Sequence, residues 1–333
     1  MRQASLHRAA ENPILTRADI PAATGILDPS SVFNPGAIEF GGRVHLMLRV
    51  QARSRRTSFV MASSTDGRTF EVEPQAVHFA GIEREERELF HLYDARLTAM
   101  QSGDSSSGDI EVLVTFAADM QDACRLGMAR TRDLVHFEFL GFSETPARNG
   151  VLFPRKFDGR YLRLERPNTV VDAGGVATGD AVRLAASDDL ISWQPLDRPQ
   201  VLEGRPRLWD ELVGSGPPPI ATRHGWLHLY HGVATHFASA NIYQAGAVLL
   251  DLEDPSLVLG RTDENLLEPR ESYELVGQVP NVVFPSGSVV RGLAPGAAAA
   301  DDDELFVYYG AADTSVALAT ARIGDLVSAC LSS

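Results

Sequence analysis

The sequence predicts an all-β protein, a five-bladed β-propeller, from its apolar segments and from an internal repeat. Short β-branched or aromatic runs recur along the chain, whereas long amphipathic helical patterns are rare. Clusters of Gly, Pro, Asp and Ser separate these runs, which include residues 43–50, 111–118, 225–233 and 304–311. Many short strands with turn residues between them are typical of β-sandwiches, barrels and propellers.

The internal repeat favours the propeller among these folds. Residues 62–70, 129–137 and 185–193 share the pattern Ala-x-Ser/Thr-x-Asp-Gly/Leu-x-x-aromatic. This pattern predicts a strand, a tight turn led by Asp, and an aromatic residue that begins the next strand. Weaker copies occupy residues 247–254 and 321–326, and successive copies start 67, 56, 62 and 74 residues apart. Units of this size hold about four short strands, which is one propeller blade.

Five such units predict one propeller domain over residues 1–333, with the first 25 residues or so wrapping or closing it. A pair of β-sandwiches with chance similarity between turns is the alternative. Residues 101–109 and 292–303 are low in complexity, so we expect both to be loop tips between strands.

Composition excludes several classes of protein. The net charge of −14 argues against nucleic acid or an anionic membrane as a partner, because both reward a basic surface. No run of 18 apolar residues could span a bilayer, and we expect no secretory signal. Cys124 and Cys330 lie far apart without metal or redox spacing. We expect two reduced thiols rather than a disulfide, in the cytoplasm or another reducing compartment.

Polar residues recur where the inner strand of each predicted blade would begin. Inner strands of a propeller line a central pocket, so side chains at this phase of every repeat should converge there. The basic ones are nearly all arginine, since Lys156 is the only lysine among 30 basic residues. The candidates are Asn34, Arg49, Asp94, Arg96, Arg148, Lys156, Arg166, His231, Tyr243 and Asp313.

Six longer segments carry a resemblance to a known family. They include FNPGA, YDARLT, NGVLFPRK and GSGPPPIATRHGWLHLYHGV, together with YQAGAVLLDLEDP and the stretch from YELVGQVPNVVFPSG to YYGAADT. The chain resembles glycoside hydrolase family 130, the β-mannoside phosphorylases and their hydrolytic relatives, which are five-bladed propellers. The resemblance implies inverting cleavage of a β-mannoside by inorganic phosphate, giving α-mannose 1-phosphate. It implies no metal and no cofactor beyond phosphate as co-substrate.

The resemblance also implies roles for single residues. Asp94 in YDARLT takes the place of the general acid, which in this family protonates the glycosidic oxygen through a mannose hydroxyl. A carboxyl group among Leu92, Tyr93 and Leu97 suits proton donation. The alternative is a structural pair between Asp94 and Arg96. Phosphate ligands are expected at Arg49, Arg148, Lys156, Arg166 and His231, and sugar ligands at Asn34, Arg96, Tyr243 and Asp313.

Two departures from the family pattern keep other activities open. Leu212 stands where phosphorylases carry a lysine, and Glu165 stands where a histidine is expected. An inverting hydrolase would need a second carboxylate, for which Glu165 and Glu211 are the candidates; either could instead be a surface or arginine-paired glutamate. Synthesis from mannose 1-phosphate, a sugar-nucleotide donor and an inactive carbohydrate-binding propeller remain alternatives. Linkage and homo-oligomerisation stay open.

Overall fold

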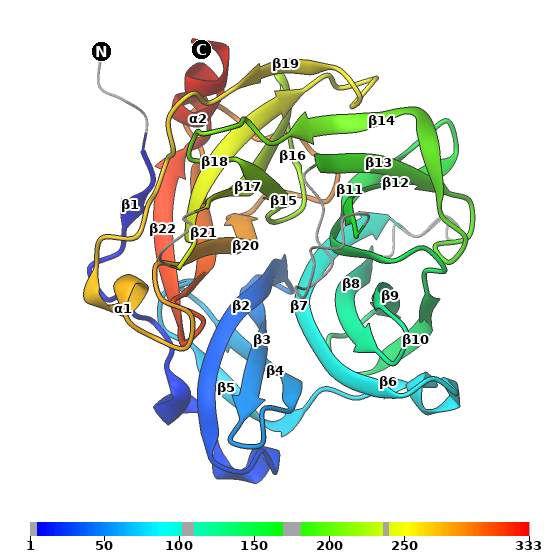
Figure 1. The fold of residues 1–333 in the computed structure, drawn as a ribbon, viewed down its shortest axis with the longest axis vertical. Helices are drawn as coiled ribbons and strands as arrows, with labels where there is room; N and C mark the ends of the chain where they lie inside the picture. Colours follow the sequence, from blue (N-terminus) through cyan, green and yellow to red (C-terminus); the bar gives the residue numbers. More distant parts are fainter. Residues whose placement is uncertain (1–4, 102–109, 169–180, 236–239, 333) are drawn as a thin grey trace.

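In the computed structural model, five sheets of mainly antiparallel strands stand around a central axis, as Figure 1 shows. The structure describes residues 5–101, 110–168, 181–235 and 240–332. The sheets are five blades of a propeller, which confirms the predicted fold. Residues 102–109, most of one predicted loop tip, lie outside the described residues.

The first three blades follow the chain from the inner strand outward. The first is β2 (Pro29–Phe40), β3 (Arg43–Ala52), β4 (Thr57–Ser64) and β5 (Glu71–Ala76). The second is β7 (Leu89–Gln101), β8 (Ile110–Met120), β9 (Cys124–Thr131) and β10 (Phe137–Phe142), with β6 (Phe79–Ala80) at its edge. The third is β11 (Ala147–Phe157), β12 (Arg160–Pro167), β13 (Ala181–Ser187) and β14 (Gln194–Glu203).

The last two blades depart slightly from this plan. The fourth has β15 (Leu212–Ser215) and β16 (Ile220–Thr222) both paired with β17 (Gly225–Ala234), followed by β18 (Ile242–Leu250) and β19 (Val258–Arg261). The fifth is β20 (Val283–Val290), β21 (Glu304–Ala311) and β22 (Ser315–Arg322), with β1 (His7–Arg8) on its outer edge. Two helices, α1 (Ser272–Leu275) and α2 (Ile323–Leu331), and three short 3₁₀ turns (Arg17–Asp19, Ala22–Thr24 and Ile82–Arg84) complete the described structure.

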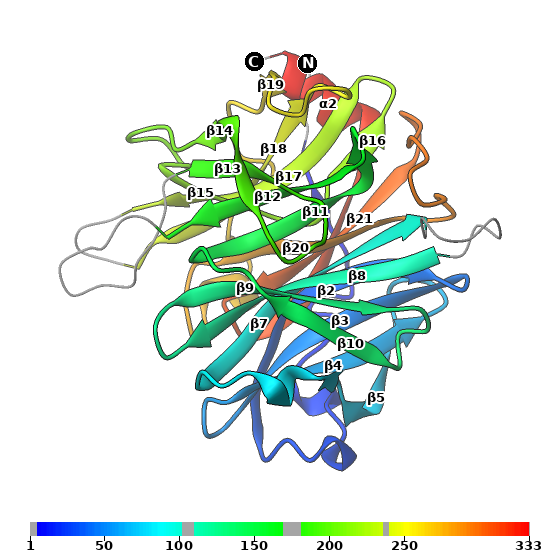
Figure 2. The same ribbon diagram turned by 90° about the vertical axis from the view of Figure 1, so that its right-hand side faces the viewer.

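The N-terminal segment supplies the outer strand of the last blade. β1 pairs antiparallel with β22, with His7 opposite Thr320. As a result the first described residues, in blue, lie at the same end of the molecule as the red helix α2 in both Figure 1 and Figure 2. The blade nearest the C-terminus is therefore completed by residues from the beginning of the sequence.

The repeated Asp forms the same turn in successive blades. In the first copy the Ser64 hydroxyl donates to the Asp66 carboxylate, which also accepts from the backbone N–H of Arg68 (2.8 Å) and Thr69 (2.9 Å). The same bonds recur in the second and third copies, at Thr131 and Asp133 and at Ser187 and Asp189. In the last copy α2 takes the place of the turn. The repeat identified in the sequence is thus a turn held by its own side chains.

The apolar core is divided among the gaps between neighbouring blades. One cluster joins the first and second blades and includes a stacked pair, Phe79 and Phe116, with ring centroids 4.7 Å apart. Comparable clusters join the other neighbouring blades. Cys124 and Cys330 are both free and buried, as the sequence predicted. Within the described residues, no helix has the length and apolar character needed to cross a membrane.

Candidate active site

A backbone irregularity on three inner strands builds the site. The ladders of β2, β7 and β11 are each interrupted, between Phe33 and Gly36, Tyr93 and Arg96, and Arg148 and Val151. At each interruption one residue has a left-handed backbone, namely Asn34 (φ 45°), Asp94 (φ 54°) and Asn149 (φ 53°). Asn and Asp tolerate this conformation better than other residues with a side chain. Such bulges re-aim side chains, here at the same level of three neighbouring blades.

Asp94 is held by two donors from the first blade. Asn34 Nδ2 lies 2.9 Å and Arg49 Nη1 lies 3.0 Å from Asp94 Oδ1. The other carboxylate oxygen, Oδ2, has no hydrogen-bond partner among the described residues. The Asp94 side chain is 11% exposed. One oxygen is therefore fixed while the other can meet a ligand.

Arg49 is a partner of Asp94 in this structure. Its guanidinium lies 4.4 Å from the ring centroid of Phe33 and 4.8 Å from that of Tyr93, so two aromatic rings fix it by cation–π contact. The sequence predicted Arg49 as a phosphate ligand and offered Arg96 as the alternative ionic partner of Asp94. The ion pair to Asp94 instead comes from Arg49.

Arg96 is fully buried behind the site. Its Nε donates to Gly216 O and its Nη1 to Asp94 O, both at 2.7 Å. Its side chain therefore fastens the bulge of β7 to the end of β15. The Arg96 side chain has no exposed surface and its donors face backbone carbonyls, which indicates a structural role; substrate binding by Arg96 stays a prediction.

Arg148, which is half-buried, and Arg166, which is buried, form a pair of like charges. They lie directly opposite each other in the β11–β12 ladder, so their side chains share one face of the sheet. Burial, together with the charge of Arg148, lowers the pKa of Arg166 to about 10. Neither arginine pairs with a carboxylate from the described part of the chain, and Nε of each lacks a hydrogen-bond partner. Two neighbouring cations, shielded from solvent and without a counter-ion among the described residues, form a site for an anion.

His231 and Tyr243 lie next to this pair of arginines. The His231 ring is 6.0 Å from the Tyr243 ring and 4.4 Å from the Phe284 ring, centroid to centroid. Burial, and then the charge of Arg166, hold the pKa of His231 well below its ordinary value. Burial raises the pKa of Tyr243, although Arg166 opposes this. His231 is therefore neutral and Tyr243 keeps its proton, so both can offer hydrogen bonds to an anion.

Asp313 adds a second carboxyl group near Asp94. It follows β21 in a left-handed conformation (φ 49°). Burial raises its pKa to about 6; Arg49 opposes the rise, and the negative charge of Asp94 adds to it. Asp313 therefore lies within the electrostatic reach of both members of the Arg49–Asp94 pair.

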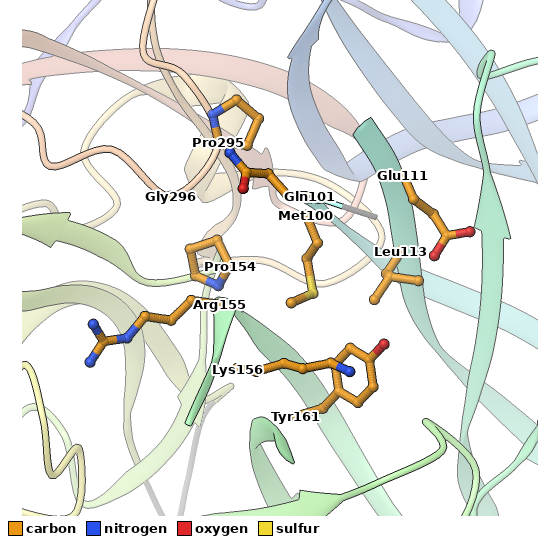
Figure 3. Close-up of a pocket in the computed structure, with 10 residues that line it drawn as sticks. All are labelled: Met100, Gln101, Glu111, Leu113, Pro154, Arg155, Lys156, Tyr161, Pro295 and Gly296. Carbon is orange, nitrogen blue, oxygen red and sulfur yellow. The ribbon is translucent and has the colours of Figure 1, made fainter. Parts of the chain in front are cut away.

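Lys156 lies away from the arginines. It is eight residues beyond Arg148 on β11, which corresponds to roughly 25 Å of extended chain. Its Nζ is 4.2 Å from the centroid of the Tyr161 ring. Both line a separate cavity of about 410 Å³ with Met100, Glu111 and Pro295, which Figure 3 shows. The structure thus puts Lys156 and Arg148 near opposite ends of β11, and a role of Lys156 as a phosphate ligand stays a prediction.

The two candidate bases are also accounted for by other contacts. Glu165 accepts from Arg163 Nε at 2.8 Å, and both side chains are buried. Successive residues of a strand point to opposite faces, so Glu165 lies on the face of β12 opposite to Arg166. Glu211 accepts a hydrogen bond from the Thr235 hydroxyl. Among the described contacts, neither glutamate reaches Asp94, and a role of either one as a catalytic base stays a prediction.

Two residues at the site were missed by the predictions. Asn149 is buried, and its Oδ1 has no hydrogen-bond partner in the described part of the chain; a Cβ on the neighbouring Gly214 would lie 3.0 Å from that oxygen. Phe284 supports the His231 ring. Asn149 stands just before a glycine in the inner strand of its blade, as Asn34 stands just before Pro-Gly in the inner strand of the first blade. This shared position in the repeat could have identified Asn149 from the sequence. Across the residues that the structure describes, no group of three or more His, Cys, Asp or Glu side chains could hold a metal ion.

The chain is similar to several known proteins over nearly its full length. A 1,2-beta-oligomannan phosphorylase of Thermoanaerobacter sp. is 32% identical over 96% of this chain and 98% of its own. A beta-1,4-mannooligosaccharide phosphorylase of Ruminococcus albus is 31% identical over 95% and 88%. The structure of beta-1,2-mannobiose phosphorylase from Listeria innocua, in complex with beta-1,2-mannobiose, covers 98% of this chain and 99% of its own with a TM-score of 0.80 and 28% identity.

A protein-family profile also matches nearly the whole chain. The glycoside hydrolase family 130 profile, described as beta-1,4-mannooligosaccharide phosphorylase, matches residues 5–331. The match includes all five blades and every residue of the site described above. This chain therefore belongs to glycoside hydrolase family 130.

Proposed function

We propose that the protein is an inverting β-mannoside phosphorylase, which uses inorganic phosphate to cleave a β-mannoside into α-mannose 1-phosphate and a shortened acceptor. The observation that carries the proposal is the Arg148–Arg166 pair, which has no carboxylate partner among the described residues and lies near Asp94. A site of this kind needs a bound anion to balance its charge. Phosphate meets that need and is also the nucleophile.

The nucleophile would be held by the arginine pair with His231. Tyr243, which the sequence predicted as a sugar ligand, would join them because it lies near Arg166 and Arg148. Guanidinium groups bind phosphate oxygens with two parallel hydrogen bonds, and the neutral imidazole and phenol add donors without adding charge. A phosphate oxygen then attacks C1 of the mannose while the bond from C1 to the glycosidic oxygen breaks. Configuration at C1 inverts because entry and departure are on opposite faces of the ring.

Asp94 would supply the proton to the departing oxygen. Asn34 and Arg49 fix its Oδ1, which leaves Oδ2 for the sugar. The family resemblance implies that the proton passes through a mannose hydroxyl, which loses its own proton to the glycosidic oxygen and receives that of Asp94. Asn34 and Asp313 are suitably placed to hold other hydroxyls. Since phosphate is the nucleophile, one protein carboxyl group is sufficient for this chemistry.

The test is product analysis with both candidate linkages. Purified protein is incubated with β-1,2-mannobiose and, separately, β-1,4-mannobiose, each with and without phosphate. We expect mannose 1-phosphate only when phosphate is present, and the linkage that reacts identifies the substrate. The reverse reaction, from mannose 1-phosphate and mannose, should build the same linkage. Free mannose formed equally well without phosphate would show a hydrolase, and binding without turnover would show an inactive propeller.

We also propose that the protein works in a reducing compartment. Both cysteines are free and buried in the fold. The Cys124 thiol contacts Tyr93 close to the site, so its oxidation would disturb the site directly. Activity should therefore be retained in millimolar thiol and should fall after treatment with an oxidant that reaches Cys124.

A further inference from the structure

Tyr93 contacts Arg49 through its ring and a second polar cluster through its hydroxyl. It immediately precedes Asp94 on β7 and is 8% exposed. One face of its ring meets the Arg49 guanidinium at 4.8 Å, and Arg49 in turn holds Asp94. Its hydroxyl makes separate contacts with β8 and β9 of the second blade. These two strands pack against β11 of the third blade, which carries Arg148.

The Tyr93 hydroxyl belongs to a buried polar cluster on three adjacent strands. It donates to Asp119 Oδ1 on β8 at 2.7 Å and lies 3.1 Å from Cys124 Sγ on β9. Burial raises the pKa of Tyr93 far above its ordinary value, so the phenol remains a donor at any working pH. The Asp119 carboxylate is therefore engaged by a neutral group.

Arg148 lies beside this cluster without forming an ion pair with it. Burial lowers the pKa of Arg148, but Tyr93, Cys124 and Asp119 outweigh that effect and raise it. Cys124 Sγ of the cluster lies 3.7 Å from the backbone oxygen of Ala147, the residue before Arg148, and the Cys124 thiol also interacts with the Arg148 side chain. Among the described residues, Arg148 and Asp119 do not form an ion pair, and Arg148 Nε has no hydrogen-bond partner. The Asp119 carboxylate is therefore near the guanidinium without being bound to it.

We propose that Tyr93 is a positioning residue of the reaction, whose ring holds Arg49 against Asp94 and whose hydroxyl keeps Asp119 from capturing Arg148. The proposal rests on the proposed function, since Arg148 is there a ligand of phosphate. Without the hydroxyl, Asp119 loses its neutral partner and is free to pair with Arg148. An Arg148 paired with Asp119 presents fewer donors and less charge to phosphate.

The inference predicts a specific kinetic pattern for Tyr93→Phe. The ring and its contact with Arg49 remain, so kcat at saturating phosphate should stay within about two-fold of wild type. The KM for phosphate should rise by about ten-fold, which is the scale of one hydrogen bond to a charged group. The KM for the mannoside should not change. Tyr93→Leu removes the ring as well, so we expect a fall in kcat in addition to the higher KM for phosphate.

A second substitution separates positioning from general damage. Asn at position 119 cannot form an ion pair with Arg148, so the double variant Y93F/D119N should recover a KM for phosphate near that of wild type. Structural damage would instead accumulate in the double variant. Tyr161→Phe, in the separate cavity of Figure 3, is the matched control and should leave all constants unchanged.

The experiment is steady-state kinetics over a range of phosphate concentrations for wild type and these variants. A wild-type rate that does not depend on phosphate would refute the proposed function itself. A phosphate-dependent wild type with an unchanged Tyr93→Phe would refute only the role of Tyr93. The role is also refuted if Asp119→Asn fails to lower the KM for phosphate in the Tyr93→Phe background. If Tyr93→Phe does not fold, Cys124→Ser takes its place, because it alters the same cluster. An unchanged KM for phosphate in Cys124→Ser would then refute the role of Tyr93.

Discussion

At the scale of single residues, Asp94 depends on its backbone as well as on its carboxyl group. The left-handed conformation at the β7 bulge brings the carboxylate to Asn34 and Arg49, which belong to the neighbouring blade. A sequence shows the Asp and its neighbours but not the bulge that turns it. This is why YDARLT indicated the acid, while its partner Arg49 became clear only from the structure.

Replacing Asp94 with Asn should abolish most of the activity. The amide keeps the shape but cannot give up a proton, and general acid catalysis is commonly worth about 10²–10⁴-fold in rate. We expect a loss in this range in the turnover of mannobiose with phosphate, with no loss of thermal stability. Asp158→Asn is the matched control, because Asp158 is also left-handed but exposed between β11 and β12. A D94N variant with most of its activity would contradict the assignment.

Asp313 should make stability depend on pH. Its pKa is about 6 in the fold against a usual 3.8, so the folded state binds this proton more tightly than the unfolded state. The stabilisation by protonated Asp313 is therefore complete below about pH 4 and is lost as pH rises through 6. Asp313→Asn should be more stable than wild type at pH 8, by on the order of 2 kcal/mol, and no more stable at pH 4. Urea unfolding at the two pH values tests this, and an equal difference at both would contradict it.

At the scale of elements, the repeated Asp turn shows which local features a sequence can reveal. The pattern of hydroxyl, Asp and aromatic is local, and its hydrogen bonds join residues only two or three apart. Such turns form wherever the residues occur, so the blades could be counted from the sequence. Contacts between strands are different: Glu165 faces Arg163 and not Arg166 because of strand alternation, and Lys156 lies at the far end of β11.

The first of these turns can be tested by Asp66→Ala. The substitution leaves the N–H groups of Arg68 and Thr69 without their acceptor, so we expect a loss of about 1 kcal/mol, as for a helix N-cap. The backbone hydrogen bonds lower the pKa of Asp66 to about 2, so its contribution exists above pH 4 and fades as pH falls to 2. Asp66→Asn keeps the acceptor and should lose less. Equal chemical stability of Asp66→Ala and wild type at pH 7 would refute the role of the turn.

At the scale of the whole molecule, residues near the N-terminus hold the propeller together. Arg8 on β1 donates through Nε and Nη2 to both oxygens of Glu274, each at 2.8 Å, and the Glu274 side chain is fully buried. The ion pair joins the strand that completes the fifth blade to α1. The sequence suggested that the first residues wrap or close the propeller, but Glu274, 266 residues away, had no signal that marked it as a partner.

Removing this ion pair should destabilise the entire fold. Arg8→Ala leaves the buried Glu274 carboxylate without its cation, and such a loss commonly lowers the free energy of unfolding by about 3 kcal/mol. We expect the urea midpoint to fall with no change in the phosphate KM, since the pair is outside the site. His7→Ala, on the exposed neighbour, is the control and should have little effect. A midpoint for Arg8→Ala equal to that of His7→Ala would contradict this role.

The central claim is that phosphate, held by Arg148 and Arg166, is the nucleophile. The most direct measurement is the initial rate of mannobiose cleavage as a function of phosphate concentration, with the product identified at each point. We expect the rate to be zero without phosphate and to rise to saturation as the phosphate concentration increases. The product should be α-mannose 1-phosphate at every concentration. A rate that is the same with and without phosphate and yields free mannose would contradict it.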